Sequence, residues 1–177
     1  MRAARVWTLA LACLSACGPP APKAPALALT GRVVDDADLL LPAQEATLTR
    51  ALAALEREKG PQFVIATTRS LQGRRIEEYS IDLTRAWGIG SAQRNDGVVL
   101  LVASNERKVR IEVGTGLKKR LPDEFCAEVI REKLLPAFQK GDFPGGIQRG
   151  AGTLIEQIRR TPAASLGLWP QRPRMAA

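Results

Sequence analysis

The chain has 177 residues, a formal net charge of +8, three cysteines and no histidine. The absence of histidine excludes a Ser-His-Asp triad, histidine-ligated zinc and phosphoryl transfer through histidine. Any enzymatic chemistry would therefore depend on carboxylates, lysine or a bound metal ion.

The N-terminal residues 1–16 have the composition of a secretory signal peptide. Two arginines precede an apolar run, residues 6–14, which is shorter than the ~20 residues that span a membrane as a helix. The sequence Leu14-Ser15-Ala16-Cys17 then resembles the bacterial lipobox. In proteins with a lipobox, the chain is cleaved before the cysteine and the cysteine is diacylated. We therefore expect a lipidated Cys17; the alternative is an ordinary signal peptide with Cys17 as a bystander.

The other cysteines and the linker agree with lipid anchoring. Cys13 leaves with the signal peptide and Cys17 takes the lipid, so Cys126 has no disulfide partner in the mature chain. Residues 17–30, rich in proline and alanine, form the expected tether, and two acyl chains suffice for stable anchoring. Gly18, rather than aspartate, follows Cys17, as in lipoproteins sorted to the outer membrane. The expected location is the cell envelope, at the outer membrane facing the periplasm in a diderm organism.

The basic charge is dispersed along the chain. Its only runs are Arg74-Arg75 and residues 118–120. Basic charge attracts nucleic acid or an anionic lipid surface, and an exported protein rarely meets nucleic acid. The dispersed charges are best interpreted as solvated faces, and attraction to an anionic lipid surface is the next alternative. We expect the membrane as a partner through the lipidated Cys17, and no nucleic acid.

One domain is expected over residues 31–160, followed by an irregular tail over residues 161–177. Its first element is a short strand at residues 32–35. A helix is predicted to begin at Pro42, because proline suits the first helical turn, and to end before Gly60. Three leucines recur at helical spacing between these two residues.

Strands and helices alternate through the middle of the domain. Residues 63–67 form an apolar run that predicts a buried strand, and apolar residues on one face predict a helix over residues 76–87. Residues 98–102 are continuously apolar, which is typical of a central strand covered on both faces. Apolar and charged residues alternate over residues 109–113, which predicts a half-buried strand in a hairpin with the preceding one.

Two helices complete the domain. One is predicted to begin at Pro122, with acidic residues in its first turn, and carries Cys126 as a small core residue. The other has apolar residues on one face from Ile147 to Ile158. The order β-α-β-α-β-β-α-α predicts an α/β fold, a three-layer αβα sandwich with a small mixed β-sheet that includes one β-hairpin.

Oxygen-bearing side chains gather at the predicted strand ends and turns. Asp35 and Asp36 follow the first strand, at the end where open α/β sheets bind ligands. Asn95 and Asp96 precede the central strand, so they join that edge only if this strand is antiparallel to the first or their loop folds over. Asp142 lies in the turn before the last helix. Such a set suits Ca²⁺ or Mg²⁺; the alternative is that these residues only shape turns.

Taken in order, several segments resemble the TPM-domain family. This family includes thylakoid proteins of photosystem II repair, an auxiliary subunit of nicotinic receptors and many bacterial envelope proteins. No single segment is specific, but seven in the same order cover nearly the whole domain. The matching segments are residues 33–37, 62–66, 70–73 with 76–79, 87–90, 95–103, 107–114 and 141–143.

The resemblance implies an αβα sandwich with a mixed sheet. It also implies divalent-metal binding at an acidic edge, chiefly of Ca²⁺, and weak acid-phosphatase activity, which is ascribed to the plant members. Asp35 matches the aspartate of the family's Asp-x-Ala motif. Where the family often has Asp-Asn-Gly before the central strand, this chain has Asn95-Asp96-Gly97, so the carboxylate is displaced by one residue.

Three functions are compatible with these features, and the one ranked last is a basic protein that only binds lipid surfaces or polyanions, since it depends on charge alone. The first is a lipid-anchored module that binds a divalent metal, Ca²⁺ rather than Mg²⁺, and supports assembly or maintenance of envelope complexes through a protein partner. The alternative is a weak metal-dependent acid phosphatase. No positioned base and no phosphate-binding loop is evident in the sequence, which favours the binding module.

Overall fold

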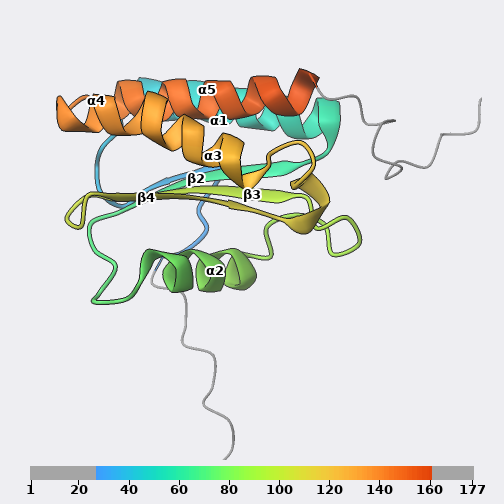
Figure 1. Ribbon diagram of the computed structural model, residues 1–177, viewed down its shortest axis with the longest axis horizontal. Coiled ribbons are helices and arrows are strands. Elements are labelled where there is room, and N and C mark those ends of the chain that lie inside the picture. The colour runs from blue at the N-terminus through green and yellow to red at the C-terminus, as the bar shows by residue number, and fades with distance from the viewer. Residues whose placement is uncertain (1–26, 161–177) are drawn as a thin grey trace, which may run out of the picture.

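The computed structural model describes residues 27–160. The predicted signal peptide, Cys17 and the tail over residues 161–177 lie outside these residues. The described part is a three-layer sandwich, with helix α2 on one face of a four-stranded sheet and the remaining helices on the other (Figure 1), which confirms the predicted fold class. Its elements are β1 (Val33–Asp35), α1 (Pro42–Lys59), β2 (Gln62–Thr68), α2 (Ile76–Trp87), β3 (Gly97–Ala103), β4 (Lys108–Val113), the 3₁₀ turn η1 (Thr115–Leu117), α3 (Asp123–Val129), the π-helical segment η2 (Ile130–Leu134), α4 (Leu135–Gln139) and α5 (Phe143–Arg160).

The four strands lie side by side in the order β1-β2-β3-β4. Strands β1, β2 and β3 are parallel, with Val33 opposite Ile65 and Ile65 opposite Leu100, whereas β4 is antiparallel to β3. Every residue of β3 is buried, as expected for a strand with neighbours on both sides and helices on both faces. The parallel arrangement places the carboxyl ends of three strands at one edge of the sheet.

Alternate side chains of the strands fill cores on both faces of the sheet. On one face, α2 packs through Tyr79 and Leu83 against Ala66 and Leu101. Leu27 belongs to this smaller core, and its carbonyl accepts a hydrogen bond from the Trp87 indole at 3.0 Å. The first described residue, Leu27, therefore packs on the α2 side of the sheet.

The larger core lies on the opposite face, between the sheet and the layer that contains α1 and α5. It includes Leu52, Phe63, Leu100 and Ile147, all fully buried. Cys126 is buried in this core too, as expected from its place in an amphipathic helix.

The ends of the helices follow from local chemistry. Helix α1 begins at Pro42, and the Gln44 side chain accepts a hydrogen bond from the Leu41 N–H at 2.9 Å. It ends at Gly60, whose φ of 87° lies in the left-handed region that glycine adopts most easily. The helix predicted to begin at Pro122 is interrupted by η2 just before Pro136, because proline lacks the N–H that a regular α-helix requires.

None of the helices formed by residues 27–160 has the length and apolar character needed to cross a membrane.

Two glycines of helix α5 provide a matched test of how this helix packs against α4. A Cβ added at Gly146 would lie 2.7 Å from Cε1 of Phe138, whereas a Cβ at Gly152 meets no atom within 4 Å. We expect Gly146→Leu to lower the free energy of unfolding by about 1–3 kcal/mol through overpacking. The control Gly152→Ala should raise it by about 0.5–1 kcal/mol, because alanine has the higher helix propensity. Urea denaturation followed by circular dichroism measures both, and equal effects would contradict the helix contact.

Candidate functional site at the carboxyl edge of the sheet

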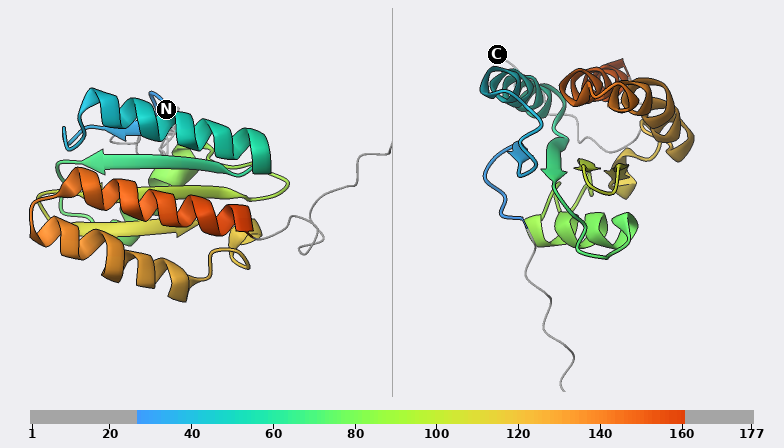
Figure 2. Two further views of the ribbon diagram at one scale, coloured as in Figure 1. Left: turned by 90° about the horizontal axis from the view of Figure 1, so that it is seen from above. Right: turned by 90° about the vertical axis from the view of Figure 1, so that its left-hand side faces the viewer.

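Four loops meet at the edge where β1, β2 and β3 end, which we call the carboxyl edge. They are the loop after β1, the loop after β2, the β3–β4 turn and the α4–α5 turn. The right-hand view of Figure 2 looks onto this edge. Ligands of open α/β sheets bind at such an edge, so its side chains are the first candidates for a functional site.

Asp35 holds the loop that follows β1. Its Oδ1 accepts a hydrogen bond from the Leu39 N–H at 3.1 Å, and its Oδ2 accepts one from the Leu40 N–H at 2.8 Å. The Thr67 hydroxyl of the neighbouring strand also donates to Oδ1. Both carboxylate oxygens are thus engaged by protein donors, which ties the β1 loop to β2.

The next two acids of this loop are exposed. Asp36 accepts one long hydrogen bond, at 3.4 Å, from the Arg69 N–H, and Asp38 forms an ion pair with the Arg69 side chain. Asp36 therefore has the least engaged carboxylate of those predicted to bind metal.

Glu106, in the β3–β4 turn, is a functional candidate that the sequence did not reveal. Its Oε1 accepts hydrogen bonds from the Ser70 hydroxyl and the Leu71 N–H, both at 2.9 Å. Its Oε2 is enclosed and has no hydrogen-bond partner among the described residues. Burial acts to raise the pKa of this carboxyl, but the hydrogen bonds from Leu71 and Ser70 outweigh it, so the pKa lies below its usual value. From the sequence alone, a glutamate in a hairpin turn that is held by such hydrogen bonds cannot be told from one whose carboxylate is exposed to solvent.

Asp142 begins helix α5 at the same edge. Its Oδ1 accepts a hydrogen bond from the Gly145 N–H at 2.9 Å, and its Oδ2 pairs with Arg149 at 3.0 Å. The hydrogen bond from Arg149, together with that from Gly145, lowers the pKa of Asp142. Such an N-terminal carboxylate is a helix cap with a defined structural role.

Asn95 and Asp96 lie at the opposite edge, because β3 is parallel to β1 and β2. Asp96 is buried, where its carboxylate pairs with Arg94 at 2.6 Å and accepts the Ser91 N–H at 2.9 Å. Asn95 donates a side-chain hydrogen bond to Thr115 at 2.9 Å. Arg120 is also buried near Asp96; burial lowers the pKa of its guanidinium, and the Asp96 carboxylate raises it.

The five residues predicted to bind a metal are therefore divided. Asp35, Asp36 and Asp142 lie at the carboxyl edge, whereas Asn95 and Asp96 lie at the other. Within residues 27–160, no group of three or more acidic, cysteine or histidine side chains is placed to hold a metal ion. Because Ca²⁺ takes six or more oxygen ligands, this arrangement does not fit one metal site built from all five residues.

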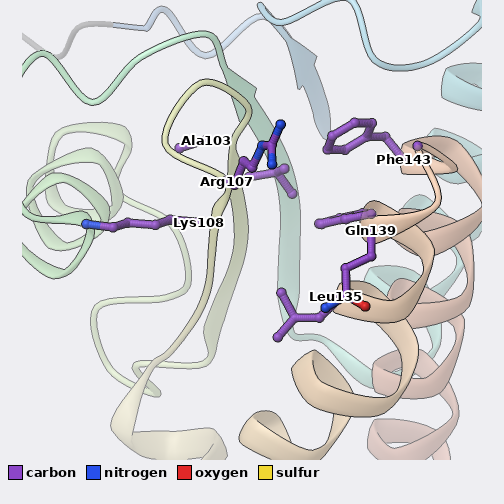
Figure 3. Close-up of a pocket in the computed structure, with 9 residues that line it drawn as sticks. Ala103, Arg107, Lys108, Leu135, Gln139 and Phe143 are labelled. Atoms are coloured by element: carbon purple, nitrogen blue, oxygen red, sulfur yellow. The ribbon is translucent and has the colours of Figure 1, made fainter.

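A cavity of about 450 Å³ opens at the carboxyl edge, between the β3–β4 turn and the α4–α5 turn. Apolar side chains form most of its wall, among them Val102, Leu135 and Phe143 (Figure 3). Arg107 lies at its opening with a φ of 50°. The left-handed backbone costs a residue other than glycine about 1 kcal/mol or more, so the turn presents this guanidinium at a conformational cost.

The only cysteine in the described part of the chain is not a nucleophile. Burial raises the pKa of the Cys126 thiol to about 11. Since the thiolate is the reactive form, Cys126 is a packing residue.

The Glu106 contacts predict a specific dependence on pH. A carboxyl whose pKa is lowered by folding stabilises the protein above its unfolded-state pKa, and this contribution is lost as the pH falls through the folded-state value. Glu106→Gln should therefore lower the melting temperature at pH 7 and have a smaller effect at pH 3. Melting followed by circular dichroism at both values tests this, with the exposed-site variant Glu128→Gln as control. An effect of Glu106→Gln that is independent of pH would contradict the assignment.

Comparisons with known proteins agree with this architecture. The family model described as the TPM domain matches residues 33–157. The N-terminal domain of a protein from P. gingivalis, solved by NMR, is 29% identical with a TM-score of 0.70, over 81% of this chain and 88% of that chain.

More distant structures share the fold. The N-terminal domain of the cg2496 protein from Corynebacterium glutamicum is 15% identical with a TM-score of 0.58, over 88% of this chain and 92% of that chain. The BA42 protein from the psychrophilic bacterium Bizionia argentinensis is 16% identical with a TM-score of 0.59, over 68% of this chain and 82% of that chain. No curated protein sequence matches. The family match spans nearly all of the described domain, and the chain belongs to the TPM-domain family.

Proposed function

We propose that this TPM-domain protein is a lipid-anchored binding module of the cell envelope, with the carboxyl edge as its ligand-binding face. One observation carries the proposal: an open cavity of about 450 Å³ lies at this edge, where α/β sheets bind ligands. The carboxylates of Asp35, Glu106 and Asp142 at the same edge are held by protein donors. These hydrogen bonds hold the loops of the carboxyl edge in one arrangement, and a preformed cavity suits ligand binding.

The N-terminal segment supports a position close to a membrane. Nine residues lie between Cys17 and Leu27, where the described domain begins on the α2 side. Fully extended, the ten Cα–Cα steps from Cys17 to Leu27 span at most about 35 Å. A lipid on Cys17 would therefore keep the domain within reach of the membrane surface and of proteins in it. We propose that an envelope protein is the partner and that the module supports assembly or maintenance of its complex.

Divalent-metal binding in this proposal uses only part of the five predicted residues, because the five do not share one edge. We assign it to the carboxyl edge, where Asp36 is exposed and accepts a single long hydrogen bond. With so few free carboxylate oxygens, we expect binding only in the millimolar range.

The alternative is a weak metal-dependent acid phosphatase. A metal ion would supply a polarised phosphoryl oxygen and an activated water there. An arginine could stabilise the charge of a phosphoryl group, but Arg69 is paired with Asp38. A thiol could act as a nucleophile, but the Cys126 thiol is buried. Neither residue therefore favours phosphatase activity. Hydrolysis of p-nitrophenyl phosphate by the wild type, well above that by Asp36→Asn, would support the phosphatase; equal rates would remove it.

Replacing the predicted lipid attachment site tests the anchor. Cys17→Ala should move the protein from the membrane fraction to the soluble fraction, because the thiol that carries the lipid is lost. The control Cys126→Ala should remain in the membrane fraction, since Cys126 is a buried core residue. Cell fractionation and metabolic labelling with a radioactive fatty acid provide the two measurements. Lipid label retained by Cys17→Ala would refute the anchor.

Calcium binding is tested through thermal stability. We expect 10 mM Ca²⁺ to raise the melting temperature of the wild type. This concentration exceeds the dissociation constants of extracellular calcium modules, which are roughly 10⁻⁴–10⁻³ M. Asp36→Asn should abolish the shift, whereas Asp96→Asn, at the opposite edge, should keep it. The absence of a shift with Ca²⁺ or Mg²⁺ would remove the metal from the proposed function and leave the binding module.

A further inference from the structure

The cavity at the carboxyl edge has a largely apolar interior. The Phe138 and Phe143 rings stack with their centroids 4.9 Å apart, and both residues line it. Val102 and Leu135 contribute from the strand side and the helix side. Surfaces of this kind favour the apolar part of a ligand, because burying apolar area removes it from water.

The opening of the cavity is positively charged. Among residues 27–160, Arg107 and Lys108 are the only charged residues that line it, and no carboxylate does. In Figure 3, the Arg107 guanidinium extends into the opening toward Phe143, whereas the Lys108 side chain points away from the cavity. Arg107 thus supplies the charge that a ligand in the cavity would meet.

Two acids of the carboxyl edge are paired with groups other than Arg107. Glu106 is engaged by Ser70 and Leu71, and Asp142 is engaged by Arg149. Within residues 27–160, no ion pair or hydrogen bond of the Arg107 side chain is present. The charge at the opening is therefore complementary to an anion rather than to the protein's own carboxylates.

We infer that the cavity binds a single-chain amphiphilic anion, with its acyl or alkyl chain between Leu135 and Phe143 and its carboxylate or phosphate head at Arg107. The volume of about 450 Å³ lies within the range of small-molecule sites, roughly 300–1,000 Å³. The inference rests on the proposed function, because it names the ligand class of the same carboxyl edge. A module anchored at a membrane would meet such molecules as free fatty acids or as lysophospholipids.

The test uses the full chain with Cys17→Ala, so that its own lipid cannot compete for the cavity. The probes are decanoate, decanol and decyltrimethylammonium, each below its critical micelle concentration, measured by isothermal titration calorimetry. Decanoate should bind, and both decanol and the cation should bind about tenfold more weakly or not at all, because they lose the charge-assisted contact with Arg107. Equal affinities for all three probes would overturn the inference.

Matched variants locate the bound head and chain. Arg107→Gln should weaken decanoate binding about tenfold, whereas Lys108→Gln, which removes the same charge from a side chain pointing away, should leave it unchanged. Gln139→Trp, at an exposed position of the wall, should block the chain. Circular dichroism confirms that each variant is folded. Equal losses in Arg107→Gln and Lys108→Gln would indicate general charge attraction and overturn the inference.

Decyl phosphate and inorganic phosphate are two further probes, the first for the source of the anionic head and the second for the contribution of the chain. Decyl phosphate binding more tightly than decanoate would indicate a phospholipid-derived ligand, and the reverse would indicate a fatty acid; either result supports the inference. Inorganic phosphate competing fully with decanoate would overturn it, because the chain would then contribute nothing. The failure of all amphiphiles would leave the Cys17 anchoring result unchanged, so this inference and the proposed function can fail separately.

Discussion

Parallel pairing of β1, β2 and β3 is the constraint on which the rest of the molecule depends. A parallel neighbour cannot be reached by a tight turn, so the chain crosses a face of the sheet between strands. Helix α1 makes the first crossing on one face and α2 makes the second on the other, which creates the three layers (Figure 2). The same pairing brings three strand ends to one edge, and only the β3–β4 hairpin returns the chain along the sheet.

The acidic side chains of the domain serve mainly as acceptors for its own loops. Asp35 joins the β1 loop to β2, Glu106 joins the hairpin turn to the β2 loop, and Asp142 begins α5. Each is a carboxylate that receives N–H or O–H donors left over at the ends of regular structure, where such groups require partners. These contacts therefore fix the loops of the carboxyl edge in place.

The elements were predictable because they depend on local patterns. The leucine spacing after Pro42, the glycine that ends α1 and the continuous apolar run of β3 each determine an element within a few residues. Strand direction is not a local property. For that reason, Asn95 and Asp96 could be assigned to an edge only once the pairing of β2 with β3 was known.

The important parts of the site depend on contacts between distant segments. Glu106 becomes notable only because Ser70 and Leu71 approach it, and Arg107 only because the hairpin turn faces the α4–α5 turn. The π-helical turns of η2 likewise reflect how a helix adapts to Pro136 while it packs on α5. Residue composition carries none of this information.

The contact between Leu27 and Trp87 has a mechanical consequence. A force applied through the N-terminal segment reaches the domain at Leu27, which is held by the smaller core and by the Trp87 indole. Such a load would enter the domain on the face of the sheet that α2 covers, whereas α4 and α5 lie on the other face. The point where the N-terminal segment joins the domain is therefore separated from the cavity at the carboxyl edge by the sheet.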